Sequence, residues 1–160
     1  MEIVLFQPDI PQNTGNIVRT CAVTGTRLTL VRPLGFSLAA RHVKRAGLDY
    51  WGGVEISCVD SLEERISDPS ASFYFFSSHA KTPYTDVSYS SDSILIFGSE
   101  TKGLPSYLRE RWPERFLTIP MRHGSRCLNL ANSASIVLYE AWRQNHFQFC
   151  ADSTITAPSQ

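Results

Sequence analysis

The chain of 160 residues lacks long apolar runs, paired cysteines and any net charge. No apolar run approaches the roughly 20 residues that a membrane-spanning helix needs, and no basic stretch or cleavage site precedes the first apolar segment. We therefore expect a soluble, cytoplasmic protein without a membrane partner. The four cysteines, at positions 21, 58, 127 and 150, are far apart and form neither a CxxC pair nor a zinc-ligand spacing. This pattern predicts neither a disulfide scaffold nor a metal site.

The charges cancel over the whole chain but are unevenly spread along it. Residues 1–45 carry six basic and two acidic side chains, residues 46–100 carry two and nine, and residues 101–143 carry seven and three. Zero net charge alone would argue against binding to nucleic acid, but two basic ends around an acidic middle leave that partner open. With 42% hydrophobic residues, the length allows one well-packed domain and little more. We expect a single domain that self-associates.

Short apolar runs alternate with helical patterns, which is typical of an α/β fold with a mostly parallel sheet flanked by helices. Strands are predicted near 3–6, 28–31, 54–59, 72–77, 93–97 and 116–119, and helices at 14–25, 39–46, 61–66, 105–112 and 130–144. Asn13 or Thr14 is expected to cap the first helix and Gly25 to end it. The periodicity ends after residue 147, so we assign residues 1–147 to the domain and 148–160 to a flexible tail.

The segment FGSETKGLP, at residues 97–105, follows an expected buried strand and places two glycines, a carboxylate and a lysine in one turn. Open α/β sheets bind ligands at the carboxyl ends of their strands. Gly98 and Gly103 would allow a ligand to approach the backbone, and Glu100 could bind it or orient a donor. A phosphate-binding P-loop would need GxxxxGK followed by Ser or Thr, which is absent. The structural alternative is a strand-to-helix turn with surface charges.

A second polar segment, IPQNTGNIVRT at residues 10–20, predicts a turn that opens a helix carrying Arg19. Such a helix start offers free amides to an anion. In the structural alternative, Asn13, Thr14 and Gly15 only cap and turn the chain, and Arg19 is solvated.

A third segment, IPMRHGSRCLNLANSAS at residues 119–135, joins a strand to the last helix through a basic loop. We favour His123 in this loop as a solvated or phosphate-contacting residue over a metal ligand. Another basic cluster, RHVKRAG at residues 41–47, either contacts phosphates or forms a solvated face. The aromatic run FYFF at residues 73–76 predicts a core strand rather than a base-stacking platform, because both faces of a parallel strand are buried.

Taken in order and spacing, these segments resemble the SPOUT-class RNA 2'-O-ribose methyltransferases, and in particular the tRNA (cytidine/uridine-34 2'-O)-methyltransferase family. The resemblance covers about residues 2–146 and is carried by FQPDIPQNTGNIVRTCAVTG, RAGLDYW, FGSETKGLP, IPM and NLANSASIVLYEAWRQ. It implies a deep trefoil knot in the C-terminal part, about residues 93–144. It also implies S-adenosyl-L-methionine as the methyl donor, without a metal, and tRNA as the substrate. In this family two subunits pair as a homodimer, so that first-segment residues of one face the cofactor of the other.

The resemblance also implies roles for individual residues. The cofactor site falls on Phe76, Gly98, Ile119 and Cys127, and the catalytic and RNA-facing positions fall on Asn13, Arg19, Glu100 and Asn129. We expect phosphate contacts from the basic residues Arg41, Lys44, Arg45, Arg122 and Arg126. Cys127 stands where this family commonly has serine, and a thiol is a weaker hydrogen-bond donor than a hydroxyl.

Methyl transfer to a ribose hydroxyl requires that the hydroxyl be positioned and lose its proton. Arg19 occupies the position often given the role of base, but a guanidinium with a pKa above about 12 stays charged. We therefore expect Arg19 to hold the adjacent phosphate and stabilise the developing alkoxide, with the proton passing to phosphate, water or Glu100. One alternative is a non-catalytic RNA-binding protein of the same fold. The other is an enzyme for ribosomal RNA, although such enzymes often carry an extra domain for which this chain has no room.

Overall fold

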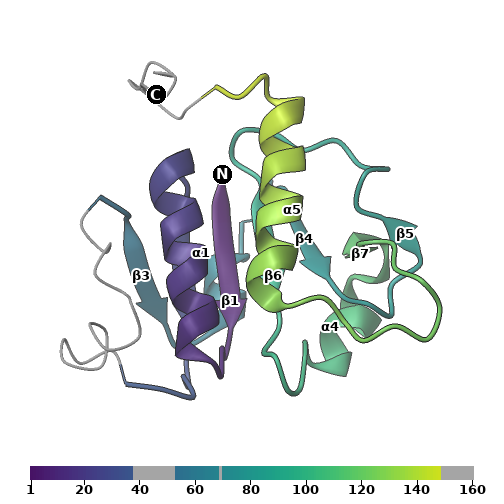
Figure 1. Cartoon of the computed structure of the whole chain (residues 1–160), viewed down its shortest axis with the longest axis horizontal. Helices are drawn as coiled ribbons and strands as arrows, with labels where there is room; N and C mark the ends of the chain where they lie inside the picture. The colour runs from purple at the N-terminus through teal and green to yellow at the C-terminus, as the bar shows by residue number, and fades with distance from the viewer. Residues whose placement is uncertain (38–52, 69, 149–160) are drawn as a thin grey trace.

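The structure, a computed structural model, describes residues 1–37, 53–68 and 70–148. They form a seven-stranded sheet in the order β3-β2-β1-β6-β4-β7-β5, in which all the strand pairings are parallel (Figure 1). The strands are β1 (Glu2–Phe6), β2 (Arg27–Val31), β3 (Ile56–Val59), β4 (Phe73–Phe76), β5 (Thr82–Pro83), β6 (Ile94–Phe97) and β7 (Phe116–Thr118). The helices are α1 (Pro11–Thr24), α3 (Leu62–Arg65), α4 (Ser106–Arg111), the 3-10 helix η1 (Pro113–Arg115) and α5 (Leu130–Gln144). The predicted α/β fold with a parallel sheet is confirmed.

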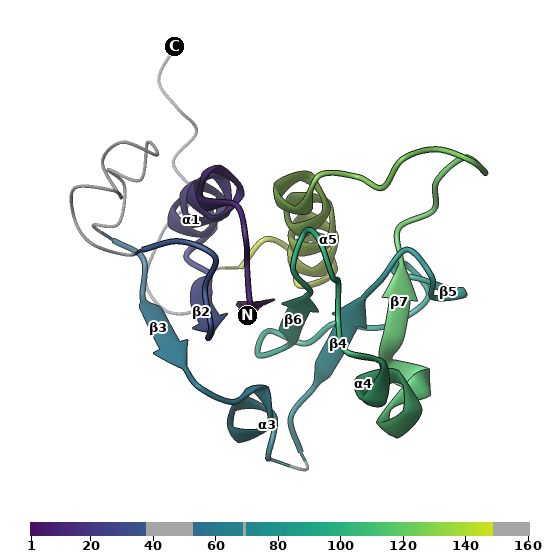
Figure 2. The ribbon, with the colours of Figure 1, turned by 90° about the horizontal axis from the view of Figure 1, so that it is seen from below.

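Helices cover both faces of the sheet, because its strands are continuous apolar runs that must be buried on each side. Ile3 and Leu5 of β1 pack in one core cluster with residues of α1 and α5. Val4, which points to the other face, packs in a second cluster with Leu62 of α3 and Leu108 of α4. Figure 2 shows α1 and α5 on one side of the strands and α3 and α4 on the other. The two helices α1 and α5 also pack against each other.

The first helix begins three residues earlier than the predicted start at residue 14. Ile10 occupies the N-cap position without a side-chain cap, and Pro11 begins the helix. Proline suits a first helical position because its φ is already fixed and its missing N–H would be unpaired there anyway. The prediction that Asn13 or Thr14 caps this helix is therefore wrong, since both are buried inside it. The predicted end is confirmed, because Gly25 takes the left-handed conformation with φ 64.

The aromatic run at residues 73–76 forms β4 and lies in the core, as predicted. The ring of Phe75 stacks on that of Phe116, and the ring of Phe76 stacks on that of Phe97, each with 4.8 Å between centroids. These stacked pairs join β4 to its two neighbours in the sheet, β7 and β6.

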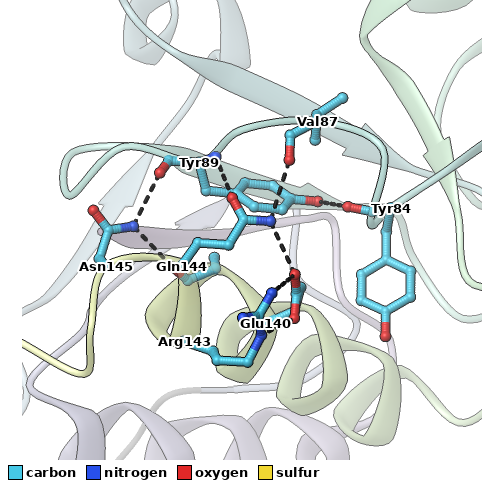
Figure 3. A network of polar contacts seen from close by, with 8 residues as sticks. Tyr84, Val87, Tyr89, Glu140, Arg143, Gln144 and Asn145 are labelled. Atoms are coloured by element: carbon cyan, nitrogen blue, oxygen red, sulfur yellow. Dashed lines mark hydrogen bonds and ion pairs between the residues drawn. The ribbon is translucent and has the colours of Figure 1, made fainter.

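After β5 at the sheet edge, the chain returns to β6 through a segment that is tied to the end of α5 (Figure 3). The backbone N–H of Tyr89 donates to Gln144 Oε1 at 2.9 Å, and Gln144 Nε2 donates to the Val87 carbonyl at 3.2 Å. Asn145 Nδ2 donates to the Tyr89 carbonyl at 3.0 Å, and the Tyr89 hydroxyl donates to the Tyr84 carbonyl at 2.6 Å. Gln144 at the end of α5 and its C-cap Asn145 thus supply side-chain partners for backbone groups of this return segment.

Several expectations lie outside the described residues: the helix at 39–46, the basic residues Arg41, Lys44 and Arg45, and most of the expected tail. None of the helices within residues 1–37, 53–68 and 70–148 combines the length and apolar character needed to cross a membrane.

Candidate active site

The loops that follow β1, β4, β6 and β7 enclose a cavity of about 520 Å³. Parallel strands end at the same edge of a sheet, so these four loops meet although they lie far apart in sequence. The volume is within the range of about 300–1,000 Å³ that is typical of small-molecule sites. Much of the wall is apolar, with Phe76 and Phe97 from the strands and Leu104, Ile119 and Leu128 from the loops.

Seven of the eight residues predicted for the cofactor and for catalysis line this cavity: Phe76, Gly98, Ile119, Cys127, Asn13, Glu100 and Asn129. The eighth, Arg19, does not line it. Arg19 is exposed on α1, six residues after Asn13, and thus about 9 Å further along the helix axis. The structure therefore brings the other seven together and leaves Arg19 outside the cavity.

Three polar side chains on the cavity wall form a hydrogen-bonded chain, which we call the relay: Glu100, Asn13 and Asn129. Asn13 Nδ2 donates to Glu100 Oε1, and Asn129 Nδ2 donates to Asn13 Oδ1, both at 2.8 Å. Asn129 Oδ1 accepts from the backbone N–H of Ala131 at 2.8 Å and so caps α5. The relay links the loop after β6, the first turn of α1 and the start of α5.

The direction of every hydrogen bond in the relay is determined by its two ends. The backbone N–H groups at the start of α5 can only donate, so they orient the Asn129 side-chain oxygen toward themselves and its NH₂ group toward Asn13. At the other end an ionised Glu100 can only accept, which requires the NH₂ group of Asn13 to face it. Asn13 is 6% exposed, so a reversed amide would leave a buried group unpaired. One arrangement of the three side chains is therefore strongly preferred.

The loop after β6 folds back tightly on itself, and Gly98 is the residue that permits this. A Cβ at Gly98 would lie 2.2 Å from the carbonyl carbon of Gly103 and 2.5 Å from the backbone nitrogen of Leu104. Gly103 adopts φ +66, which favours glycine, and its N–H donates to the Ser99 carbonyl at 2.9 Å. The loop itself thus occupies the space where a side chain at position 98 would lie, and Gly98 also lines the cavity.

A further residue, Asp9, holds this loop against the end of β1. Its backbone N–H donates to Glu100 Oε2 at 2.8 Å, and its carboxylate accepts from the Thr101 hydroxyl. The hydrogen bond from Thr101 lowers the pKa of Asp9 below its ordinary value. Sequence reasoning missed Asp9 because nothing in the segment FQPDIP indicates a partner 92 residues away.

The three cysteines that the structure describes are free, and they differ in exposure. Burial raises the pKa of the Cys21 thiol to about 12. Cys127 is exposed at the cavity wall, where its Sγ lies 3.4 Å from Ser78 Oγ, the acceptor of its S–H. The predicted cofactor-site residue Cys127 therefore lies at the cavity.

The loop that joins β7 to α5 carries the predicted basic residues Arg122 and Arg126, both of them exposed. Two further cations, Lys102 and Arg109, line the cavity, and neither had been predicted as a site residue. Within the described part of the chain, no group of three or more His, Cys, Asp or Glu side chains could hold a metal ion.

Comparisons with known proteins place the chain in a family. The sequence model of the SpoU rRNA Methylase family matches residues 1–139. A tRNA (cytidine(34)-2'-O)-methyltransferase of Methylovorus glucosotrophus is 43% identical over 148 residues, which are 91% of this chain and 96% of that protein. A Listeria monocytogenes protein that provisionally bears the same name is 49% identical over 149 residues, covering 91% of this chain and 88% of its own.

Solved structures agree with this assignment. One, described as giving structural insights into the 2-OH methylation of C/U34 on tRNA, superposes with a TM-score of 0.83 at 39% identity, over 92% of this chain and 97% of that one. The SpoU methyltransferase AviRb from Streptomyces viridochromogenes, in complex with AdoMet, shares the fold with a TM-score of 0.77 at 24% identity, over 91% of this chain and 58% of that one. The chain therefore belongs to the SpoU methylase family.

Proposed function

We propose that this protein transfers a methyl group from S-adenosyl-L-methionine to the ribose 2'-OH of the wobble nucleotide of tRNA, cytidine or uridine 34. The observation that carries the proposal is the cavity, where apolar side chains of the wall meet the relay of Glu100, Asn13 and Asn129. The names of the relatives at 43% and 49% identity support the choice of tRNA and of position 34.

The residues around the cavity fit the methyl donor in size and chemistry. The apolar wall suits an adenine ring, and the polar loop backbone after β6 suits the ribose and the amino-acid part. Phe76, Gly98, Ile119 and Cys127 would hold the cofactor, partly through backbone groups. When bound, the cofactor supplies a methyl group already activated on a sulfonium. The protein's own tasks are then to bind, to orient the ribose and to provide for the loss of its proton.

We assign the relay to positioning rather than to proton transfer. Both oxygens of Glu100 already accept a hydrogen bond, one from Asn13 Nδ2 and one from the backbone N–H of Asp9, each at 2.8 Å. A carboxylate used in this way holds its two donors in place. Of the proton acceptors considered from the sequence, this favours phosphate or water over Glu100.

We place Arg19 at the active site of the partner subunit in a homodimer. Its absence from the wall of its own cavity supports this arrangement, because the family's first-segment residues face the partner's cofactor. Helices α1 and α5 are the candidate contact face, because they carry exposed apolar side chains. These are Val23 on α1 and Ile136 and Tyr139 on α5, with exposed fractions of 60%, 37% and 45%. In that position a guanidinium would bind the neighbouring phosphate and stabilise negative charge on the attacking oxygen.

Other parts of the proposal concern the chain as a whole. We propose that residues 93–144 form a deep trefoil knot within one domain of residues 1–147, that residues 148–160 are a flexible tail, and that the protein works in the cytoplasm. Membership of the family supports the knot. Exposed Arg122 and Arg126 support a tRNA contact beside the cavity, with Arg41, Lys44 and Arg45 as the second basic segment.

Mass spectrometry of nucleosides from individual tRNAs tests the proposal. Cells that lack the gene should lose 2'-O-methylation at position 34, and the purified protein with S-adenosyl-L-methionine should restore it in tRNA from those cells. An unchanged position 34 together with a lost ribose methyl group in ribosomal RNA would overturn the choice of tRNA. Protein that binds this tRNA but restores no methyl group would support the non-catalytic alternative instead.

A further inference from the structure

One charged side chain at the cavity that does not belong to the relay is Arg109 of α4. Its guanidinium lies over the ring of Phe116, 5.3 Å from the centroid, and its Nη2 donates to Ser77 Oγ at 3.1 Å. Ser77 directly follows Phe76 at the end of β4, and Phe116 belongs to the adjacent strand β7. Two neighbouring strands thus hold the arginine at the cavity wall.

Among the described residues, Arg109 has fewer neighbouring partners for its donors and charge than Glu100 or Lys102 at the same wall. The oxygens of Glu100 accept from Asn13 and Asp9, and Lys102 interacts electrostatically with Asp9, whose pKa it helps to lower. No carboxylate lies within ion-pair distance of Arg109 in residues 1–37, 53–68 and 70–148. Of its five N–H donors, one serves Ser77, so a fork of donors remains for an anionic ligand group.

The cavity therefore has two polar ends. The relay lies over β1 and β6, where the loops after these strands meet α1 and α5. The basic end lies over β4 and β7, where Arg109, Ser77 and Ser78 line the wall. The methyl donor carries a sulfonium, an ammonium and one carboxylate, and it has a net positive charge. An arginine at the wall would repel such a ligand unless the carboxylate lay against it.

We propose that Arg109 binds the α-carboxylate of the cofactor's amino-acid part and so sets the direction in which the cofactor lies in the cavity. This assignment rests on the proposed use of S-adenosyl-L-methionine. A tRNA phosphate would also suit a guanidinium, but the contact with Ser77, next to the cofactor-site residue Phe76, favours a group inside the cavity. The exposed Arg122 and Arg126 are better placed for phosphates that approach from solvent.

Titration calorimetry with two ligands tests the assignment. S-adenosylhomocysteine has the carboxylate, whereas 5'-methylthioadenosine has the same nucleoside and sulfur but no amino-acid part. Arg109→Gln should weaken S-adenosylhomocysteine roughly 10- to 100-fold, the effect of losing a bidentate charged contact, and should leave 5'-methylthioadenosine within about twofold. Ser77→Ala should weaken only S-adenosylhomocysteine, by a smaller factor, because it loosens the guanidinium without removing it.

The matched control is Arg111→Gln on the same helix, because Arg111 lies over the Trp112 ring and does not line the cavity. It should leave both ligands unaffected. Equal weakening of both ligands by Arg109→Gln would overturn the assignment, as would no change in either. Unchanged cofactor affinity with weaker binding of tRNA would assign Arg109 to a phosphate instead. Wild-type protein without measurable heat at millimolar S-adenosylhomocysteine would overturn the proposed function, and this inference with it.

Discussion

The Asn129 side chain has two tasks: its oxygen caps α5, and its nitrogen donates to Asn13. Two substitutions at this position separate the tasks. Asn129→Ala removes both. The lost cap costs about 1 kcal/mol, and the unpaired oxygen of buried Asn13 costs about 1–3 kcal/mol more, so the free energy of unfolding should fall by about 2–4 kcal/mol. Asn129→Asp keeps an oxygen for the cap and adds a negative charge at a helix start, which is worth about 0.3–1 kcal/mol. It also turns an acceptor toward the Asn13 oxygen, which breaks the relay.

The aspartate variant should therefore be more stable than the alanine variant by about 1–2 kcal/mol. In both variants the rate of methyl transfer should be about 100-fold lower than in the wild type. A displacement of the reacting groups by about 1 Å can produce an effect of this size. Urea unfolding gives the stabilities, and single-turnover transfer of labelled methyl groups to tRNA at saturating cofactor gives the rates. Equal stability of the two variants would show that the cap contributes nothing. A wild-type rate in Asn129→Asp would show that the relay does not orient the reacting groups.

Three further predictions concern other parts of the cavity. Gly98→Ala should destabilise the protein by about 2–3 kcal/mol or more in urea unfolding, because the new methyl group meets the backbone of Gly103; an unchanged midpoint would contradict the tight loop. Cys127→Ser should bind S-adenosylhomocysteine several-fold more tightly in calorimetry, because a hydroxyl is the stronger donor; equal affinity would indicate a backbone contact. The lowered pKa of Asp9 means that its carboxylate stabilises the fold above the ordinary value of 3.8, and that this stabilisation is lost as the pH falls through the lowered pKa. Below about pH 4, the melting temperature should therefore fall more steeply in the wild type than in Thr101→Val, and parallel curves would refute this.

Apolar runs predict the strands of this protein well because buried parallel strands need them. The runs at residues 3–6, 28–31 and 93–97 all appear as strands, within one residue at each end. The failures have local causes. Asn13 and Thr14 are typical capping residues, but Pro11 starts the helix before them. The side-chain amide of Asn13, which could have capped the helix, instead takes part in the relay. The strand β5 has only two residues, too few for any periodicity.

For the cavity, resemblance to a family identified residues that pattern alone would not have grouped. No local signal links Asn13 to Asn129, which is 116 residues away, because the contact depends on how the strands are ordered in the sheet. The order of strands also explains why Asp9 and Arg109 were missed. Each is held by a hydrogen bond to a residue from another part of the fold, Asp9 to Thr101 and Arg109 to Ser77.

The two ends of α5 are held by different parts of the chain, Asn129 by the relay and Gln144 by the return segment at Val87 and Tyr89. Fifteen helical residues span about 22 Å, so the helix fixes the distance between these two anchor points. An inserted residue would turn one end by about 100° and move it by about 1.5 Å relative to the other. Both sets of hydrogen bonds could not then form together. The length of α5, and not only its apolar face, is therefore a condition for a correctly built active site.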